Sequence, residues 1–269
     1  MDSVYASASI NYLDGEQFLP ICIDALNGRA VDGLNWQVNG FELRRHVSAV
    51  TDWHDEEALA GGYCDEIEAL ARDLCHCDHV LFFPPLVRSP AAAAQHHDFA
   101  PVHLAHSDYT EGYADMIRDR AHPYRRVIAP SIARAGLSDA QIANCSRVLT
   151  LQFWRNVGSP LMDYPLVVCD ATSVARDDLV AIEVPEYGGQ KTEFESFALR
   201  ADGHLQCHRW YTFPQMREDE VLIFRAFDSD CLASARPFWT PHSAFADPNA
   251  GANPVPRQSV EMRAICLFD

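Results

Sequence analysis

Three side chains in this sequence have the types and spacing of a metal site. His106 and Asp108 flank a single serine, and His242 follows much later in the chain. Residues i and i+2 of a β-strand face the same side, so His106 and Asp108 can reach one ion together. Two histidines and one carboxylate leave part of the coordination sphere of an iron(II) ion open. The spacing therefore predicts non-haem iron(II) chemistry.

An arginine and a serine follow His242 in a segment with the pattern of a final strand. Arg257 and Ser259 alternate with apolar or neutral residues, so both side chains face one side of that strand. The alternation continues through Glu261 and Arg263. A guanidinium holds a carboxylate through two parallel hydrogen bonds, and a neighbouring hydroxyl adds a third. We expect Arg257 and Ser259 to bind the far carboxylate of a keto-acid cosubstrate, with Arg263 as the rival anchor.

Two other His-x-Asp sequences leave the metal site open when the residues are considered alone. They are His76-Cys77-Asp78 and the pair at the ends of His96-His97-Asp98. In an acidic chain with twelve histidines, such a pair also arises as a surface histidine beside an aspartate. His242 lies in an apolar and aromatic segment, which also fits a histidine of the core. The residues alone therefore do not choose among the three pairs.

A cysteine-rich segment, Cys75-His76-Cys77-Asp78-His79, has the residue types of a zinc site. It lacks a Cys-x-x-Cys pair and a distant partner pair, which structural zinc sites use. We therefore expect ordinary side chains at a helix end there.

The composition limits the classes of partner that this chain is expected to bind. The 269 residues carry a net charge of −17, whereas a nucleic-acid-binding protein presents a basic face. The same charge disfavours an anionic membrane surface. No apolar run approaches the roughly 18 residues of a membrane helix, and residues 1–15 lack the pattern of a signal peptide. We expect the nine cysteines to be reduced thiols of a cytoplasmic protein with a small-molecule substrate, and a homodimer remains open.

The order of the expected elements indicates the fold. Residues 1–50 have the pattern of irregular extended structure, with a turn at Asp14-Gly15. Apolar residues at three- and four-residue spacing predict a helix from Asp55 to Leu74, and a second helix is expected from Ser138 to Cys145. The expected strands are His79–Phe83, Val148–Trp154, Pro165–Cys169, Leu179–Val184, Phe194–Leu199, Gln206–Phe213, Glu220–Phe227 and Ser259–Phe268.

Helices first and strands later, without βαβ alternation, indicate an antiparallel β core with helices outside it. The expected architecture is mainly β with flanking helices, a cupin-like double-stranded β-helix or jelly roll. We expect a single domain over residues 1–269. Its N-terminal extended segment and helices would occupy residues 1–100, and its jelly-roll core would occupy residues 101–269.

A series of short motifs runs from about residue 40 to the C-terminus. They are Gly40-Phe41-Glu42-Leu43, the helix Tyr63–Leu74, His106-Ser107-Asp108-Tyr109-Thr110, Phe153-Trp154-Arg155, Asp163-Tyr164-Pro165-Leu166, Cys169-Asp170, Trp210-Tyr211, Asp219-Glu220-Val221, Phe227-Asp228-Ser229, Pro241-His242-Ser243-Ala244-Phe245 and Pro256-Arg257-Gln258-Ser259-Val260-Glu261-Met262-Arg263. In these motifs the chain resembles a family of small non-haem iron oxygenases of bacterial and fungal secondary metabolism. That family includes the cephamycin 7α-methoxylation hydroxylase component, a fungal gibberellin desaturase and the endoperoxide-forming enzyme of novofumigatonin biosynthesis.

The resemblance implies an Fe(II)- and 2-oxoglutarate-dependent dioxygenase that uses O2 on a natural-product intermediate. It implies His106, Asp108 and His242 as iron ligands and Arg257 as the cosubstrate anchor, and it favours this His-x-Asp pair over the other two. The chain departs from the family in Gln152-Phe153-Trp154-Arg155-Asn156, where the family tends to have Asn before the Trp-Arg pair and Pro after it. It also has Gln258 where the family usually has Glu.

The expected outcome is hydroxylation, desaturation or a related oxidation at a C–H bond. One alternative is a non-haem iron oxygenase that uses no keto acid, and another is a metal-free jelly-roll binding protein. Metal analysis separates the binding protein from the enzymes, and succinate release separates the two enzymes. The expected substrate-binding residues are Tyr109, Trp154, Arg155, Trp210 and Tyr211.

Overall fold

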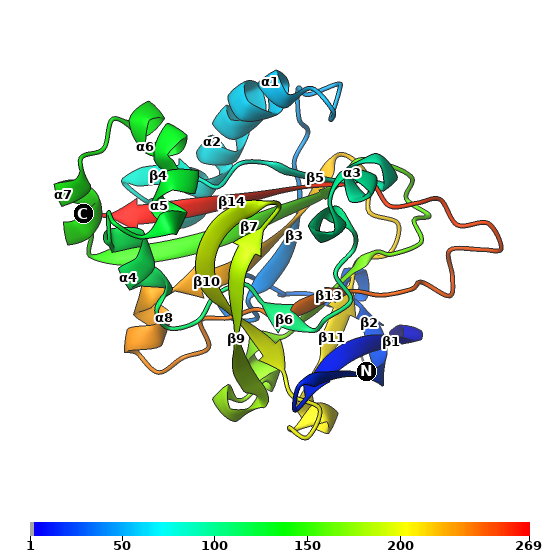
Figure 1. Ribbon diagram of the computed structural model, residues 1–269. Coiled ribbons are helices and arrows are strands. Elements are labelled where there is room, and N and C mark those ends of the chain that lie inside the picture. The colour runs from blue at the N-terminus through cyan, green and yellow to red at the C-terminus, as the bar shows by residue number, and fades with distance from the viewer. Residues whose placement is uncertain (1–2) are drawn as a thin grey trace.

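Two long strands form the centre of a six-stranded β-sheet in this computed structural model, which describes residues 3–269 (Figure 1). They are β7 (Arg147–Asn156) and β14 (Ser259–Phe268), which pair antiparallel along their whole length. The sheet order is β3-β12-β7-β14-β4, and β5 also pairs with β14. The other strands are β3 (Phe41–Arg45), β4 (His79–Phe82), β5 (Leu86–Arg88) and β12 (Glu220–Asp228).

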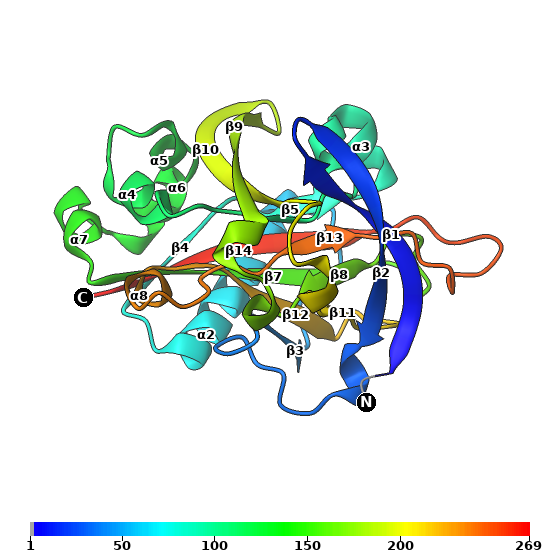
Figure 2. The same ribbon diagram turned by 90° about the horizontal axis from the view of Figure 1, so that it is seen from below.

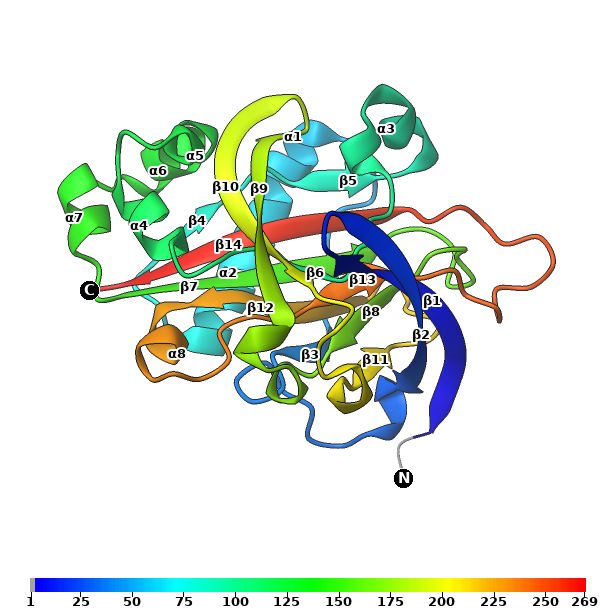
Figure 3. The same ribbon diagram turned by 60° about the horizontal axis from the view of Figure 1, so that its bottom comes forward.

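A second sheet of eight strands has the order β1-β2-β11-β8-β13-β6-β10-β9. Adjacent strands of this sheet run antiparallel to each other, except β2 and β11, which are parallel. Strands β9 and β10 of this sheet cross over the six-stranded sheet (Figure 3). The fold is therefore a jelly roll, as expected. The strands are β1 (Val4–Asp14), β2 (Gln17–Asn27), β6 (His106–Ser107), β8 (Leu166–Cys169), β9 (Leu179–Tyr187), β10 (Gln190–Leu199), β11 (Trp210–Thr212) and β13 (His242–Ala244).

The six-stranded sheet has two chemically different faces because side chains alternate along each strand. On β7, Leu151 and Phe153 face outward into a core cluster with Tyr63 and Ile67. Those two residues belong to the helix that lies on this face of the sheet, away from β9 and β10 (Figure 1). The inner face of β7 therefore carries the intervening residues, among them Trp154, toward the eight-stranded sheet.

The helix expected from Asp55 is confirmed, in three consecutive segments. They are α1 (Glu56–Ala58), a π-helical turn (Leu59–Tyr63) and α2 (Cys64–Cys75). The Asp55 carboxylate accepts hydrogen bonds from the first free backbone amides and caps the start. The Gly61-Gly62 pair lies in the π-helical turn. The helix ends at Cys75, and the next residue, His76, has a left-handed φ of 56°.

The remaining helices are short, and α4, α5, α6 and α7 lie at one end of the molecule (Figure 1). Of these four, only α7 was expected, and its start is held by a capping box between Ser138 and Gln141. The α-helices are α3 (Pro90–Gln95), α4 (Tyr113–Arg118), α5 (Pro123–Val127), α6 (Ala129–Ala135), α7 (Asp139–Asn144) and α8 (Ser229–Ala233). The short 3-10 turns are Gly28–Ala30, His97–Phe99, Ala171–Ser173, Arg176–Asp178 and Leu205–Cys207.

The prediction of irregular structure over residues 1–50 was wrong. Strands β1 and β2 form a long hairpin, seen along one side of the molecule in Figure 2. Its turn lies at the expected place, with Gly15 at a φ of 61°. Strands β1–β5 pair into both sheets, so the expected division at residue 100 does not separate the core from an outer segment. The expected strand Gln206–Phe213 is reduced to Trp210–Thr212.

Candidate active site

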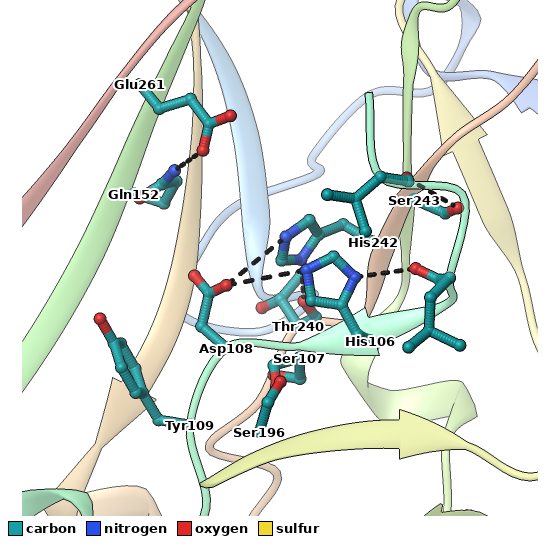
Figure 4. Close-up of polar contacts among 12 residues, drawn as sticks. His106, Ser107, Asp108, Tyr109, Gln152, Ser196, Thr240, His242, Ser243 and Glu261 are labelled. Carbon is teal, nitrogen blue, oxygen red and sulfur yellow. Dashed lines mark hydrogen bonds and ion pairs between the residues drawn. The ribbon is translucent and has the colours of Figure 1, made fainter. Parts of the chain in front are cut away.

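Strands β6 and β13 place the two candidate histidines side by side. His106 and His242 are direct cross-strand partners, and their ring centroids are 4.3 Å apart. Asp108 follows β6 immediately and points at both rings (Figure 4). Its Oδ1 lies 3.9 Å from Nε2 of His106 and 3.8 Å from Nε2 of His242. Three possible ligand atoms therefore surround one point.

Backbone carbonyls fix which nitrogen of each ring faces that point. Nδ1 of His106 lies 2.8 Å from the Leu104 carbonyl, and Nδ1 of His242 lies 3.1 Å from the Thr240 carbonyl. A carbonyl only accepts hydrogen bonds, so each Nδ1 carries the proton and each Nε2 keeps its lone pair. Burial and the neighbouring His242 lower the pKa of His106 to about 4, which keeps this ring neutral. The donor set of two imidazoles and a carboxylate fits an iron(II) ion.

Arg263 holds the carboxylate of this cluster. Its Nε donates to Oδ2 of Asp108 at 3.2 Å, and its Nη2 donates to Oδ1 at 3.4 Å. Burial alone would raise the pKa of Asp108, but the charge of Arg263 and its hydrogen bonds hold that pKa well below its ordinary value. Asp108 is therefore ionised and oriented. This pairing engages the arginine that sequence analysis named as the rival cosubstrate anchor.

A cavity of about 230 Å³ opens over the cluster between the two sheets. His106, Asp108 and His242 line it, and so do Arg257 and Trp154. Most of the remaining wall is apolar or aromatic, so a substrate in it is largely shielded from water. The apolar lining consists of Phe83, Val102, Leu104, Tyr109, Tyr124, Leu166, Ile182, Val184, Phe194, Phe224 and Ala244.

Several buried donors at or near the start of β14 have no partner among residues 3–269. Nη1 of Arg257 donates to the Tyr164 carbonyl at 3.1 Å, but its Nε is unpartnered among the described residues. The hydroxyl of Ser259 and the indole N–H of Trp154 are also unpartnered there. Burial, followed by repulsion from Arg88, lowers the pKa of Arg257 to about 10, so the side chain is charged at neutral pH. Such unsatisfied donors suit a bound carboxylate.

A third arginine of the cavity, beside Arg257 and Arg263, escaped sequence analysis. Arg88 on β5 forms an ion pair with Glu261 and donates to the Tyr187 hydroxyl at 2.7 Å. Gln152 donates to the other oxygen of Glu261 at 2.8 Å (Figure 4). In this network the charges of Arg88 and Glu261 are already paired with each other. The face of β14 that alternation predicted is confirmed, but Glu261 is buried and Arg263 is mostly buried, so the face is not an exposed one.

The expected substrate-binding residues divide into two groups. Tyr109 and Trp154 line the cavity. Arg155 does not, because it follows Trp154 on β7 and so faces the other side, where it donates to the carbonyls of His46 and Glu218. The other two residues that do not reach the cavity are Trp210, which donates to the Tyr12 hydroxyl, and Tyr211, which packs against Phe41.

The other two His-x-Asp pairs have different surroundings. His96, His97 and Asp98 also group their ligand atoms, but His97 is exposed and Asp98 accepts a hydrogen bond from the backbone of Gly188. His76 and Asp78 belong to no such group among residues 3–269. The cluster of His106, Asp108 and His242 is thus the one whose three ligand groups all line the apolar cavity between the sheets.

Known proteins resemble this chain over most of its length. A family model described as oxidoreductase/YMDC permease-like domain matches residues 15–267. A protein of Aspergillus novofumigatus named Fe(II)/2-oxoglutarate-dependent dioxygenase nvfI is 28% identical over 211 residues, covering 78% of this chain and 68% of that protein. A fungal protein named alpha-ketoglutarate-dependent dioxygenase phiK is 29% identical over 238 residues, covering 86% and 78%. The solved structure of the iron and alpha-ketoglutarate-dependent endoperoxidase NvfI shares the fold, with a TM-score of 0.78 at 21% identity over 98% of both chains.

Proposed function

Because the chain belongs to the oxidoreductase family that this domain model describes, we propose that it is an Fe(II)- and 2-oxoglutarate-dependent dioxygenase. Its relatives bear the names of such enzymes. The observation that carries the proposal is the meeting of two Nε2 lone pairs and one ionised carboxylate in an apolar cavity. His106, Asp108 and His242 would bind the iron. An iron ion held by these residues would supply, with O2 and a keto acid, the oxidising power needed to remove hydrogen from a C–H bond.

The side chains around the cluster keep its ligands in their reactive forms. The carbonyls of Leu104 and Thr240 hold the two rings, so Nε2 rather than Nδ1 faces the ion. Arg263 keeps Asp108 ionised and restricts its rotation. Because the carboxylate of Asp108 is already oriented, metal binding needs less free energy to order it. Arg263 is therefore a positioning residue in this proposal.

Arg257 and Ser259 would hold the far carboxylate of 2-oxoglutarate. Arg257 has a free Nε in a buried position at the cavity. Ser259, two residues further along the chain and the first residue of β14, has a hydroxyl that is unpartnered among the described residues. A carboxylate provides the acceptors that these donors lack. Arg88 is a poorer anchor because Glu261 already neutralises it.

The apolar walls would orient the substrate and exclude water. Tyr109 and Phe194 pack with ring centroids 5.7 Å apart on one side of the cavity, and Phe224 packs at 4.6 Å from His242. These surfaces bind carbon skeletons rather than ions. The substrate is a small molecule, and relatives named hydroxylase/desaturase support a natural-product intermediate. Hydroxylation, desaturation and ring formation share the first hydrogen abstraction, so the proposal covers all three outcomes.

We also propose a cytoplasmic enzyme that forms a homodimer. All nine cysteines are free, which suits a reducing compartment. Exposed Phe18 and Leu19 on β2 offer apolar surface for a second copy. In the part of the chain that the structure describes, no helix has the length and apolar character needed to cross a membrane. Sedimentation analysis tests the dimer, which a monomer at micromolar concentration would contradict.

Metal analysis of anaerobically prepared protein tests the iron site. The wild-type chain should bind about one Fe(II), since the ligand set is complete for one ion. His242→Ala should lose most of it, because the other two ligands do not complete a stable site. Full iron binding by both His242→Ala and Asp108→Ala would overturn the assignment. Iron loss on changing His96 or Asp98 instead would move the site there.

A turnover assay tests whether the enzyme requires the keto acid. Substrate oxidation by the wild-type enzyme should require 2-oxoglutarate and release succinate in step with product. Oxidation without the keto acid would favour the keto-acid-independent oxygenase, and absence of bound iron would favour a metal-free binding protein.

A further inference from the structure

Three cysteine thiols meet on the outer side of the six-stranded sheet, where α2, β4 and β14 come together. Cys75 is the last residue of α2, Cys77 lies between α2 and β4, and Cys266 is on β14. Their Sγ atoms all lie within 4.8 Å of one another. Cys77 is 5% exposed, Cys266 is fully buried and Cys75 is half-buried. The group is therefore closed toward the core and open beside Cys75.

The fold explains why residues so far apart in sequence meet. His76 has a left-handed backbone, which ends α2 and redirects the chain toward β4. Arg72 donates to the carbonyls of Cys77 at 3.0 Å and Asp78 at 2.8 Å, which fixes the connecting segment. Cys266 pairs with Val80 of β4 and faces the core cluster that α2 covers. Cys266 is the distant partner whose apparent lack argued against a metal site in the cysteine-rich segment.

We propose that Cys75, Cys77 and Cys266 bind a single thiophilic d10 cation, such as Cu(I) or Zn(II), at a site independent of the iron centre. Metal–sulfur bonds of about 2.3 Å place three sulfurs around one ion roughly 4.0 Å apart. The three Sγ atoms are at most 4.8 Å apart, so each Sγ–Sγ distance has to shorten by less than about one ångström to bind the ion. Thiolates are soft ligands and select such ions over iron(II).

Two arginines near the group would offset part of the negative charge that metal-bound thiolates carry. Arg147 and Arg72 contribute positive potential at Cys75 and Cys77, respectively. The group contains only sulfur donors among the described residues, so its chemistry is distinct from that of the nitrogen and oxygen donors in the cavity. A bound ion would tie the end of α2 to β14. Because the folded chain presents all three thiols together, binding should raise the melting temperature.

Titration of the reduced, Fe(II)-loaded full chain with Cd²⁺ under anaerobic conditions tests the site. Thiolate bonds to Cd²⁺ give an ultraviolet charge-transfer absorption that imidazole and carboxylate ligands do not. We expect this absorption to saturate at about one equivalent. Cys75→Ser and Cys266→Ala should each weaken binding by at least roughly tenfold, because each removes a direct ligand. Cys207→Ser is the matched control, since Cys207 is exposed and outside the group, and it should titrate like the wild type.

Cys75→Ser is the decisive variant because Cys75 is half-buried, and its serine replacement is the change least able to disturb folding. Circular dichroism and unchanged iron content confirm that each variant is folded. Absence of the charge-transfer absorption in the wild type, or equal absorption in Cys75→Ser, would overturn the proposal. So would a disulfide among these three cysteines in protein isolated without reductant. Competition with a Cu(I) chelator and a Zn(II) chelator then identifies which ion binds more tightly.

Discussion

Replacing Arg257 by alanine should weaken 2-oxoglutarate binding while leaving iron in place. The Arg257 side chain is buried at the cavity, and its free Nε can donate to a carboxylate. A hydrogen bond to a charged group contributes about 1.5–3 kcal/mol, and each 1.4 kcal/mol is about a factor of ten in binding. Losing one such bond should therefore raise the dissociation constant at least roughly tenfold. Loss of a bidentate pair should raise it further.

Anaerobic calorimetric titration of the iron-loaded protein with 2-oxoglutarate measures this constant without a known substrate. Arg257→Lys is the matched variant, because it keeps the charge and loses the planar fork. We expect it to recover only part of the affinity. Iron content, measured in the same samples, should equal that of the wild type, since Arg257 donates to Tyr164 and not to a proposed ligand.

Arg263→Ala is the comparison that can refute the assignment of Arg257. Arg263 contacts Asp108, so its loss should reduce iron binding first. If Arg263→Ala retains iron but no longer binds 2-oxoglutarate, while Arg257→Ala binds it normally, then Arg263 is the anchor. That pair of results would contradict the reasoning from unsatisfied donors.

Three further predictions concern positioning, pH and packing. Arg263→Met should weaken Fe(II) binding by roughly 10–100-fold, because Asp108 loses the group that orients it, and unchanged affinity in a metal titration would reject this role. Burial alone would raise the pKa of Asp178. Hydrogen bonds from backbone amides, from the His204 imidazole and from a second imidazole nearby lower this pKa to about 2. Since the unfolded value is about 3.9, this stabilisation should be present above pH ~4 and disappear toward pH 2, and acid unfolding of Asp178→Asn should lack that step. Ile67→Ala should cost about 2–5 kcal/mol of unfolding free energy in urea, because Ile67 is fully buried between α2 and the sheet.

Alternation predicted the long central strands well because one face of each is apolar and packs on a core. The strand Ser259–Phe268 has the predicted bounds, and the predicted strand Val148–Trp154 lies within β7. The β1–β2 hairpin escaped prediction because it lies at a sheet edge and its strands carry many exposed residues. Such strands lack a clean apolar period. Helices α4–α6 are so short that periodicity has little to act on.

The candidate site was partly accessible to sequence analysis. Spacing and resemblance named the three grouped side chains, and the alternation of β14 named the face that carries Arg257 and Arg263. Strand periodicity predicts that Trp154 and Arg155 face opposite sides of the sheet, but it does not predict which of them faces the cavity. That depends on how the sheets pack. The pairing of Arg88 with Glu261 is likewise a contact between strands distant in sequence. Local patterns carry no information about such contacts.

The two histidine rings are held by carbonyls that lie two residues before them in their own segments. Their orientation therefore does not depend on which ion occupies the centre. Affinity of such a donor set rises from iron through cobalt and nickel to copper(II), and zinc also competes well. Trace zinc or copper should thus displace iron and inactivate the enzyme during purification. In the cell, correct loading would follow from the supply of free iron relative to these competitors, rather than from selection by the protein.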